Sequence, residues 1–333
     1  MKKLELKAPP FILQAGLFVE QEYKTYKEMA TSSTDNWEYH CTYELHPRAL
    51  TGRHQILQLE TMLISLGKRP GGMMHDVLSA QNSITLAIQV ELEDKGCFDK
   101  FKLSVGDIVV FDDSRAYNFM TNAKVKLAVV TIAKESFGPM LPYFLDACVH
   151  TLRDTDNKLA NLLQNIWDEF TSSTPSKNYK DAEQKILNIL EDISQTQTPK
   201  PSSLTPGEKI VYSIREQVYK HMDGNLKISE LVKQYDISER NLQYSFKSLF
   251  GFTPKVFMRR LKLNLVRHDL SFETTSETTV VKVAHKWGFF HMGHFSQYYK
   301  ELFEEKPSET LKRTSEHDKA FTGECVARQE EIS

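Results

Sequence analysis

The chain has 333 residues, of which 40% are hydrophobic and 26% charged, enough for two domains with separate hydrophobic cores. No apolar run approaches the roughly 18 residues that a membrane span requires. The first ten residues, MKKLELKAPP, lack the apolar stretch of a secretory signal. Four scattered cysteines without a CxxC pair argue against a disulfide framework and a structural zinc site, and indicate a reducing cytoplasm.

The formal net charge of −2 is unevenly distributed along the chain. Residues 208–313 contain 18 Lys and Arg against 13 Asp and Glu, a net charge of +5, which leaves −7 for the remainder. Such asymmetry is typical of a basic nucleic-acid-binding domain joined to an acidic domain.

Residues 10–135 have the alternating pattern of short β-strands. The clearest strand is predicted at 84–92, where every second residue is large and apolar, as on a half-buried strand. Further strands are predicted at 58–66, 107–111 and 125–132. Turns that contain glycine separate several of these segments. The spacing predicts a small antiparallel barrel or sandwich.

From residue 139 the apolar period becomes helical, with two stripes. The first consists of Leu159, Leu162, Leu163, Ile166, Trp167 and Phe170, and the second of Ile186, Ile189, Leu190 and Ile193. The two helices are interpreted as packing on the sheet; the alternative is that one stripe pairs two subunits. Residues 196–206 (TQTPKPSSLTP) are rich in Pro, Ser and Thr and are predicted to be a linker.

The last third of the chain contains an internal repeat. Residues 228–232 (ISELV) resemble residues 280–284 (VVKVA), and a candidate turn residue follows each segment, Asp236 in the first copy and Gly288 in the second. Farther on, Leu242, Phe246, Phe250 and Pro254 have the same spacing as Phe295, Tyr299, Phe303 and Pro307. The offset is 52 residues before the turn and 53 after it, so the second copy has one extra residue at its turn. Each copy is predicted to be a helix-turn-helix unit.

A helix is predicted over residues 254–270, between the two copies, and it carries several basic residues. It would join the two units rigidly and hold both second helices toward one face of a duplex. Two such helices enter successive major-groove turns when they lie about 34 Å apart.

Two sets of residues in this region carry a resemblance to a known family. The first consists of Ser238, Leu242, Gln243, Phe246, Lys247, Gly251, Pro254, Leu261 and Leu263, and the second of Val280, Ala284, Gly288, Phe289, Phe295, Tyr299, Phe303 and Pro307. Together they resemble the DNA-binding domain of the AraC/XylS family, and residues 287–311 resemble its regulators of ethanolamine-utilisation type. Asp236 stands where Gly is commoner and Gln297 where Arg is frequent, so the family's base preference does not carry over.

We expect DNA contacts from both recognition helices and from the basic residues around them. Arg bridges guanine, Gln bridges adenine, and Tyr touches a thymine methyl group or a phosphate. The expected base-reading residues are Arg240, Gln243, Tyr244, His291, Met292, His294 and Gln297. The expected phosphate contacts are Lys247, Arg259, Arg260 and Lys300, for which a solvated surface position is the alternative. No Cys or carboxylate completes a zinc site with the two histidines, so no metal is expected there.

The resemblance implies a cupin-like sensor barrel in the N-terminal part. Enzymatic cupins hold a metal through an HxH pair, a carboxylate and a third histidine. His46, His54 and His75 form no such pair, which argues against a metal-dependent enzyme. A barrel without metal ligands can still enclose one small molecule.

The sequence therefore predicts a two-domain α+β chain. Its parts are a cupin-like sensor and dimerisation domain with a helical extension at 1–195, the linker at 196–206, an all-α DNA-binding domain at 207–314 and a tail at 315–333. The expected function is a dimeric cytoplasmic transcription activator that needs no cofactor, binds double-stranded DNA, works with RNA polymerase and is gated by a small molecule. The alternatives are gating by a partner protein and, more distantly, a cupin enzyme.

Overall fold

The computed structural model describes residues 18–23, 26, 28–29, 37–47, 52–69, 72–92, 97–98, 101–102, 104–121, 125–148, 150–170, 179–199, 206–221, 227–272 and 277–314. The chain forms two compact units. The N-terminal unit consists of Met1–Thr42 and Leu50–Leu204, and the C-terminal unit of Tyr43–Ala49 and Thr205–Ser333. The short segment Tyr43–Ala49 thus packs with residues that follow it by more than 150 positions.

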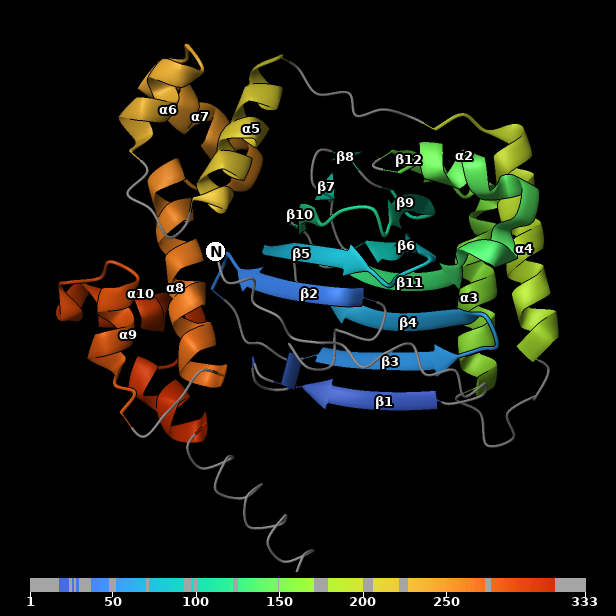
Figure 1. The fold of residues 1–333 in the computed structure, drawn as a ribbon, viewed down its shortest axis with the longest axis horizontal. Helices are drawn as coiled ribbons and strands as arrows, with labels where there is room; N and C mark the ends of the chain where they lie inside the picture. The colour runs from blue at the N-terminus through green and yellow to red at the C-terminus, as the bar shows by residue number, and fades with distance from the viewer. Residues whose placement is uncertain are drawn as a thin grey trace, which may run out of the picture. The chain divides into compact units, whose positions relative to one another are not determined.

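Two β-sheets form the frame of the N-terminal unit (Figure 1). The seven-stranded sheet has the order β1-β3-β4-β11-β6-β9-β12 and the five-stranded sheet the order β2-β5-β10-β7-β8. The first sheet contains β1 (Phe18–Tyr23), β3 (Gly52–Gln58), β4 (Met62–Arg69), β6 (Ser83–Leu92), β9 (Asp107–Asp112), β11 (Val125–Ala133) and β12 (Thr151–Arg153). The second contains β2 (Trp37–Glu44), β5 (Met73–Ser79), β7 (Cys97–Phe98), β8 (Phe101–Lys102) and β10 (Tyr117–Thr121). The last two residues of β2, Tyr43 and Glu44, are counted with the C-terminal unit.

Residues of the central strands alternate between the two faces of the seven-stranded sheet, as the period of two requires. Leu86 and Ile88 of β6 belong to the core beneath the helices. Ala87, which lies between them, packs instead in a cluster with Trp37 of β2 and Val77 of β5. The N-terminal unit is therefore layered as helices, seven-stranded sheet and five-stranded sheet.

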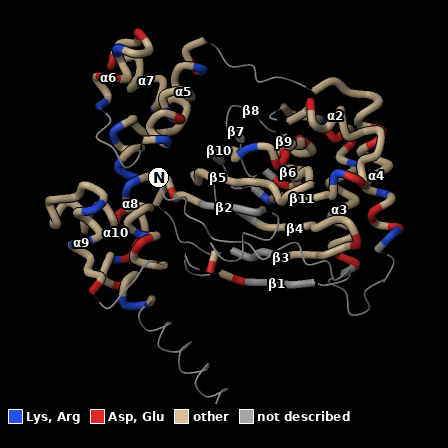
Figure 2. Tube along the Cα trace, viewed as in Figure 1, with Lys and Arg blue, Asp and Glu red and all other residues tan. Residues whose placement is uncertain are grey.

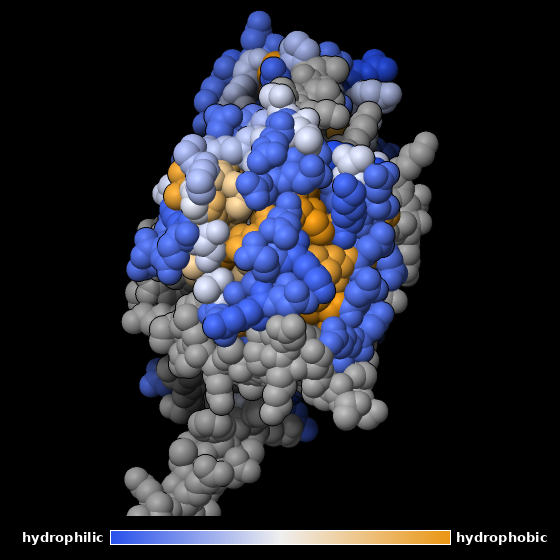
Figure 3. All heavy atoms as spheres, turned by 90° about the vertical axis from the view of Figure 1, so that its right-hand side faces the viewer, coloured by the Kyte–Doolittle hydropathy of each residue, from blue (hydrophilic) through white to orange (hydrophobic). Residues whose placement is uncertain are grey.

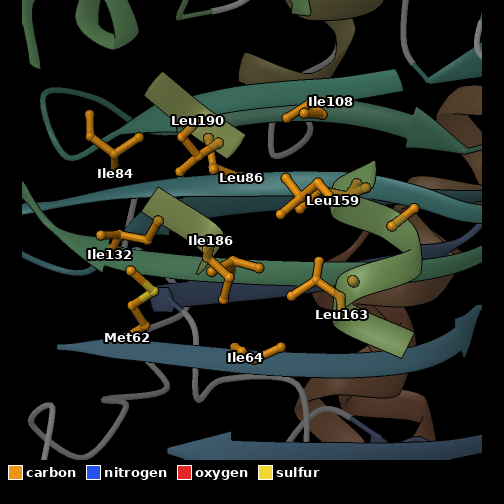
Figure 4. Packing of buried hydrophobic residues seen from close by; sticks show 14 of the residues in the cluster. Met62, Ile64, Ile84, Leu86, Ile108, Ile132, Leu159, Leu163, Ile186 and Leu190 are labelled. Carbon is orange, nitrogen blue, oxygen red and sulfur yellow. The ribbon is translucent and has the colours of Figure 1, made fainter. Parts of the chain in front are cut away.

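The helical layer consists mainly of α3 (Lys158–Phe170) and α4 (Tyr179–Thr196). Figure 4 shows Leu159 and Leu163 of α3 with Ile186 and Leu190 of α4, all against side chains of the sheet. Both predicted apolar stripes thus pack on the sheet. On the outside, this face of the molecule is largely hydrophilic, with apolar residues showing beside the hydrophilic ridges (Figure 3). Between β11 and α3 lie η1 (Lys134–Met140), α2 (Leu141–Asp146), β12 and η2 (Thr155–Asn157).

Two predictions for this unit differ from the structure. Among the described strands, no pairing closes the two sheets into a barrel, so the cupin-like barrel is not confirmed, although the paired sheets fit the sandwich form. The single strand predicted at 58–66 is wrong, because β3 ends at Gln58 and β4 begins at Met62. The amide of Leu59 donates to the carbonyl of Met62 over 2.9 Å, and the side-chain amide of Gln58 donates to the carbonyls of Leu59 and Met62. Since this turn contains no Gly or Pro and keeps Leu59 buried, the apolar pattern continues through it.

In its described residues, the C-terminal unit is largely helical apart from Tyr43–Pro47. It contains α5 (Pro206–Lys220), α6 (Ile228–Gln234), α7 (Glu239–Phe250), α8 (Pro254–Phe272), α9 (Val280–Lys286) and α10 (Met292–Phe303), followed by helical residues 307–314. Most of the predicted linker (residues 200–205) and the predicted tail at 315–333 lie outside the described residues. None of the helices in the described ranges is long and apolar enough to cross a membrane.

Candidate nucleic-acid interface

The two pairs α6–α7 and α9–α10 have the same turn. α6 is followed by Asp236 with φ 47° and α9 by Gly288 with φ 83°, both in the left-handed region. In the first copy the amide of Ile237 donates to the carbonyl of Val232 over 3.2 Å. In the second copy the amide of Phe289 donates to the carbonyl of Ala284 over 2.9 Å. A bond that spans five residues at a left-handed helix end is the Schellman arrangement. The internal repeat in the sequence is therefore a repeat in backbone geometry.

After the turn the two copies differ at the start of the second helix. In the first copy Ser238 is the N-cap of α7, and its hydroxyl accepts a hydrogen bond from the amide of Asn241 over 3.2 Å. In the second copy the N-cap is His291, which makes no side-chain cap. Because Ile237 corresponds to Phe289 and Ser238 to His291, the extra residue of the second copy is Phe290.

Each helix pair has its own apolar core, which orients its recognition helix. In the first copy Leu231 of α6 and Leu242 and Phe246 of α7 are fully buried. In the second, Val283 and Ala284 of α9 lie in one cluster with Phe295, Tyr299, Leu302 and Phe303 of α10 and Leu263, Val266 and Leu270 of α8. The buried stripes fix which side of α7 and α10 remains exposed.

Asp269 of α8 ties the second turn to the joining helix. Its carboxylate accepts from Lys286 Nζ over 2.6 Å and from Trp287 Nε1 over 2.8 Å, where α9 ends. Burial alone would raise the pKa of Asp269, but the contacts with His268, Lys286 and Trp287 outweigh it and hold that pKa below its ordinary value. The charged form of Asp269 thus fixes α9 to α8.

Glu44 binds α8 within the same unit. The backbone amide of Glu44 donates to Asn264 Oδ1 over 2.8 Å, and Asn264 Nδ2 donates to the carbonyl of Glu44 over 2.7 Å. The Glu44 carboxylate pairs with Arg267 over 2.5 Å, with both side chains almost fully buried. The Arg267 guanidinium also lies over the ring of Phe303, 3.8 Å from its centroid.

On α7, the three predicted base-reading residues Arg240, Gln243 and Tyr244 are exposed. Tyr244 is 77% exposed, although its side chain is large and partly apolar. The amide of Gln243 donates to the Glu239 carboxylate over 3.1 Å at the surface, a contact that water or a base edge can replace. The buried stripe places these three side chains together on the outer side of α7.

On α10, His291, His294 and Gln297 are exposed and Met292 is half-buried. The ring of His294 stacks on Tyr298 with centroids 6.1 Å apart, and Gln297 donates to Glu301 over 2.8 Å. Within the described ranges, no three His, Cys, Asp or Glu side chains come together as a metal-binding group.

The four predicted phosphate-binding residues differ in their surroundings. Lys247 and Lys300 are exposed. Arg259 is half-buried, with its guanidinium 3.8 Å from the ring centroid of Tyr298. Arg260 donates to the carbonyl of Leu45 and lies over a neighbouring aromatic ring, and burial, with the charge of Arg259, lowers its pKa. Arg260 is thus half-buried like Arg259, but its guanidinium is engaged by the Leu45 carbonyl, unlike the other three side chains.

Figure 2 shows Lys and Arg positions along α8. One of them is Lys262, whose Nζ would lie 3.7 Å from a Cβ built on Gly288. The joining helix therefore brings a positive charge to the turn of the second helix pair.

Two features of this region were missed by the sequence analysis. The helix α5 was not predicted, although Val211, Ile214 and Val218 have helical spacing and are buried. The position of Glu44 beside Arg267 has no local sequence signal, because 223 residues separate the pair.

Comparison with known proteins gives matches in the same part of the chain. A family model described as a helix-turn-helix domain matches residues 231–313. XylDLEGF operon transcriptional activator 1 of Pseudomonas putida is 34% identical over 106 residues, which are 32% of this chain and 31% of that protein. The probable thc operon regulatory protein of Rhodococcus erythropolis is 31% identical over 114 residues, 34% of this chain and 33% of that protein. The chain thus spans about one third of the length of these curated relatives.

Among solved structures, a probable AraC family transcriptional regulator from Rhodopseudomonas palustris is 33% identical. The match covers 32% of this chain and 97% of that one, with a TM-score of 0.31. The AraC-like transcriptional activator CuxR is 10% identical over 76% of this chain and 96% of that one, with a TM-score of 0.42. The curated relatives from Pseudomonas putida and Rhodococcus erythropolis are named as a transcriptional activator and a regulatory protein. Residues 231–313 therefore form a helix-turn-helix domain of the AraC/XylS type.

Proposed function

We propose that this protein is a sequence-specific DNA-binding transcription regulator that acts as an activator in the cytoplasm. The observation that carries the proposal is the pair of equivalent helix-turn-helix units on either side of α8, each with an exposed polar face on its second helix. The matched relatives from Pseudomonas putida are named as operon activators, which supports the direction of regulation. RNA polymerase is the partner that an activator requires.

In this proposal, the exposed residues of α7 and α10 divide into two kinds of contact. Arg240, Gln243 and Tyr244 read base edges from α7. His291, Met292, His294 and Gln297 read them from α10. Lys247, Arg259 and Lys300 neutralise phosphates, which fixes the register of the protein but carries no base preference. Arg260 is predicted to join them only after it releases the carbonyl of Leu45.

The test compares one residue of each kind on a duplex that the full-length protein selects from a random-sequence pool. We expect Gln243→Ala to relax preference at one base pair, with a loss of about 1–3 kcal/mol for the selected base and little change for the other three. Lys300→Ala should weaken binding to the selected and the scrambled duplex equally. It should also reduce the slope of log affinity against log salt concentration by about one, the contribution of one phosphate contact. Equal losses on both duplexes for Gln243→Ala would contradict the base-reading role.

We further propose that the N-terminal unit is a cupin-like sensor for a small molecule. Gln89 of β6 supports this, because its side chain is fully buried and neither amide atom has a hydrogen-bond partner in the structure. Its position two residues from Ala87 places it on the side of the sheet that faces the five-stranded sheet. A buried amide without partners costs free energy, and a bound ligand or an ordered water would remove that cost.

Native mass spectrometry of the purified full-length protein tests the sensor proposal. We expect a mass above 38.4 kDa per chain that falls to the chain mass after denaturation. The alternative is gating by a partner protein; a ligand-free chain whose regulation depends on a co-purified protein would favour that alternative.

We also propose that the protein is a homodimer. Leu162 of α3 and Leu187 and Ile189 of α4 are only partly buried against the core, so they leave apolar surface on the helical layer. Light scattering of the full-length chain should give twice the chain mass, and a triple change of these residues to Gln should give the monomer. A wild-type monomer at all concentrations would contradict the proposal.

A further inference from the structure

Within the described part of the chain, large hydrophobic side chains that are exposed are few: Leu145, Tyr244, Val281 and Phe290. Tyr244 belongs to the proposed base-reading set on α7. Phe290, which is 70% exposed, belongs to no set named so far. Its ring touches His285 of α9, with centroids 5.5 Å apart.

The exposure of Phe290 follows from the extra residue in the second copy. At a helix start, the residue before the N-cap usually packs against the fourth helical residue. In the second copy those positions are Phe290 and Phe295. The contact is made instead by Phe289, whose ring centroid is 5.2 Å from that of Phe295. Phe289 thus takes the packing role, and Phe290 is left on the surface directly before the N-cap of α10.

We propose that Phe290 is a further specificity-determining residue, whose ring packs against the 5-methyl group of a thymine at the edge of the site that α10 reads. This inference rests on the proposed function, since it requires α10 to enter the major groove. Recognition helices enter with their N-terminal residues against the bases, and Phe290 immediately precedes His291 and Met292 at that end.

The chemistry of the ring selects its target. A phenyl ring has no hydrogen-bond donor or strong acceptor, so it cannot read the polar edges of bases. The thymine methyl group is the apolar feature of the major groove. The positive charge of Lys262 beside Gly288, two residues before Phe290, favours a polyanion over an apolar protein surface at this position.

The experiment uses the full-length protein and the duplex that it selects from a random-sequence pool. Each dT in the footprint is replaced in turn by dU, which removes only the methyl group. We expect one replacement in the half-site of α10 to weaken wild-type binding about fivefold, the effect of one lost methyl contact. Phe290→Ala should weaken binding to the parent duplex by a similar factor. The variant protein should then bind the dU duplex and the parent duplex equally well.

Val281→Ala is the matched control, because Val281 is an exposed apolar residue of the same helix pair, 46% exposed on α9. It should keep the wild-type sensitivity to dU. Phe290→Ala should keep the wild-type melting temperature, since its ring is mostly exposed.

Three results would overturn the inference. The first is that no dU replacement in this half-site weakens binding of the wild-type protein. The second is that Phe290→Ala stays sensitive to dU. The third is that Phe290→Ala loses transcription activation at unchanged DNA affinity, which would assign the ring to a protein partner. If the wild-type protein selects no sequence at all, it is the proposed function that fails.

Discussion

Removal of the Glu44 carboxylate should destabilise α8, although Glu44 precedes that helix by more than 200 residues. The exposed fractions of the Arg267 and Glu44 side chains are 3% and 2%. In Glu44→Leu the guanidinium would stay buried and lose the Glu44 carboxylate. Removal of one partner of a buried ion pair costs about 3–5 kcal/mol. We expect the lower end, about 3 kcal/mol, because the ring of Phe303 still faces the cation and Asn264 still binds the backbone of residue 44.

The assay is native-state hydrogen exchange on peptides from α8, since it reports the opening free energy of one region in a chain of two units. The double variant Glu44→Leu with Arg267→Met should recover most of the loss, because an apolar pair replaces a buried ion pair at little cost. The exposed pair Asp181–Lys185 on α4 is the control: Asp181→Asn should change the opening of α4 by less than about 0.5 kcal/mol. If Glu44→Leu changes the opening of α8 by less than about 1 kcal/mol, Tyr43–Ala49 does not stabilise the C-terminal unit as described.

Three further predictions concern single residues. Folding lowers the pKa of Asp269. The Asp269 carboxylate therefore stabilises the fold fully above its pKa in the unfolded chain, about 3.9, and this stabilisation is lost as the pH falls through the lower pKa of the folded protein. Exchange in α9 should therefore accelerate below about pH 4. Asp269→Asn removes the carboxylate charge that pairs with Lys286, so exchange in α9 of this variant should be fast already at neutral pH. A neutral-pH rate equal to wild type would refute this. Gly288→Ala should lower the free energy of unfolding by about 1 kcal/mol, because residue 288 has a positive φ. Gly293→Ala, in α10 with open space around it, should raise that free energy by about 1 kcal/mol. Chemical denaturation measures both changes, and equal effects would contradict the turn assignment. Gln89→Leu should raise the free energy of unfolding of the ligand-free protein by about 1–3 kcal/mol, and a decrease would mean that its amide has a bound partner.

Much of the C-terminal unit could be predicted because its signals are local. Asp236 and Gly288 mark the turns, and the buried positions Leu242 and Phe295 recur at helical spacing within each copy. Such patterns report which side of a helix is buried, and so which side of α7 and α10 is exposed. Even the extra residue of the second copy was visible in the sequence, although its identity as Phe290 and its exposure were not.

The features that sequence reasoning missed depend on contacts between distant residues or on a break without a turn residue. Nothing near Arg260 in the sequence shows that its guanidinium donates to the carbonyl of Leu45, so the sequence predicted it only as a phosphate contact beside Lys247, Arg259 and Lys300. The hairpin at residues 58–62 interrupts a continuous apolar pattern because the side chain of Gln58 supplies the hydrogen bonds of the turn. Closure of the sheets was likewise out of reach, since the order of strands is set by pairing across the whole unit.

In the proposed function, both helix-turn-helix units bind one DNA duplex. The most direct measurement is a hydroxyl-radical and methylation-interference footprint of the full-length protein on its selected duplex. We expect two major-groove contact regions on one face, centred about 34 Å apart. Arg240→Ala should weaken the first region and His294→Ala the second. A single contact region, or two regions that both variants leave unchanged, would contradict it.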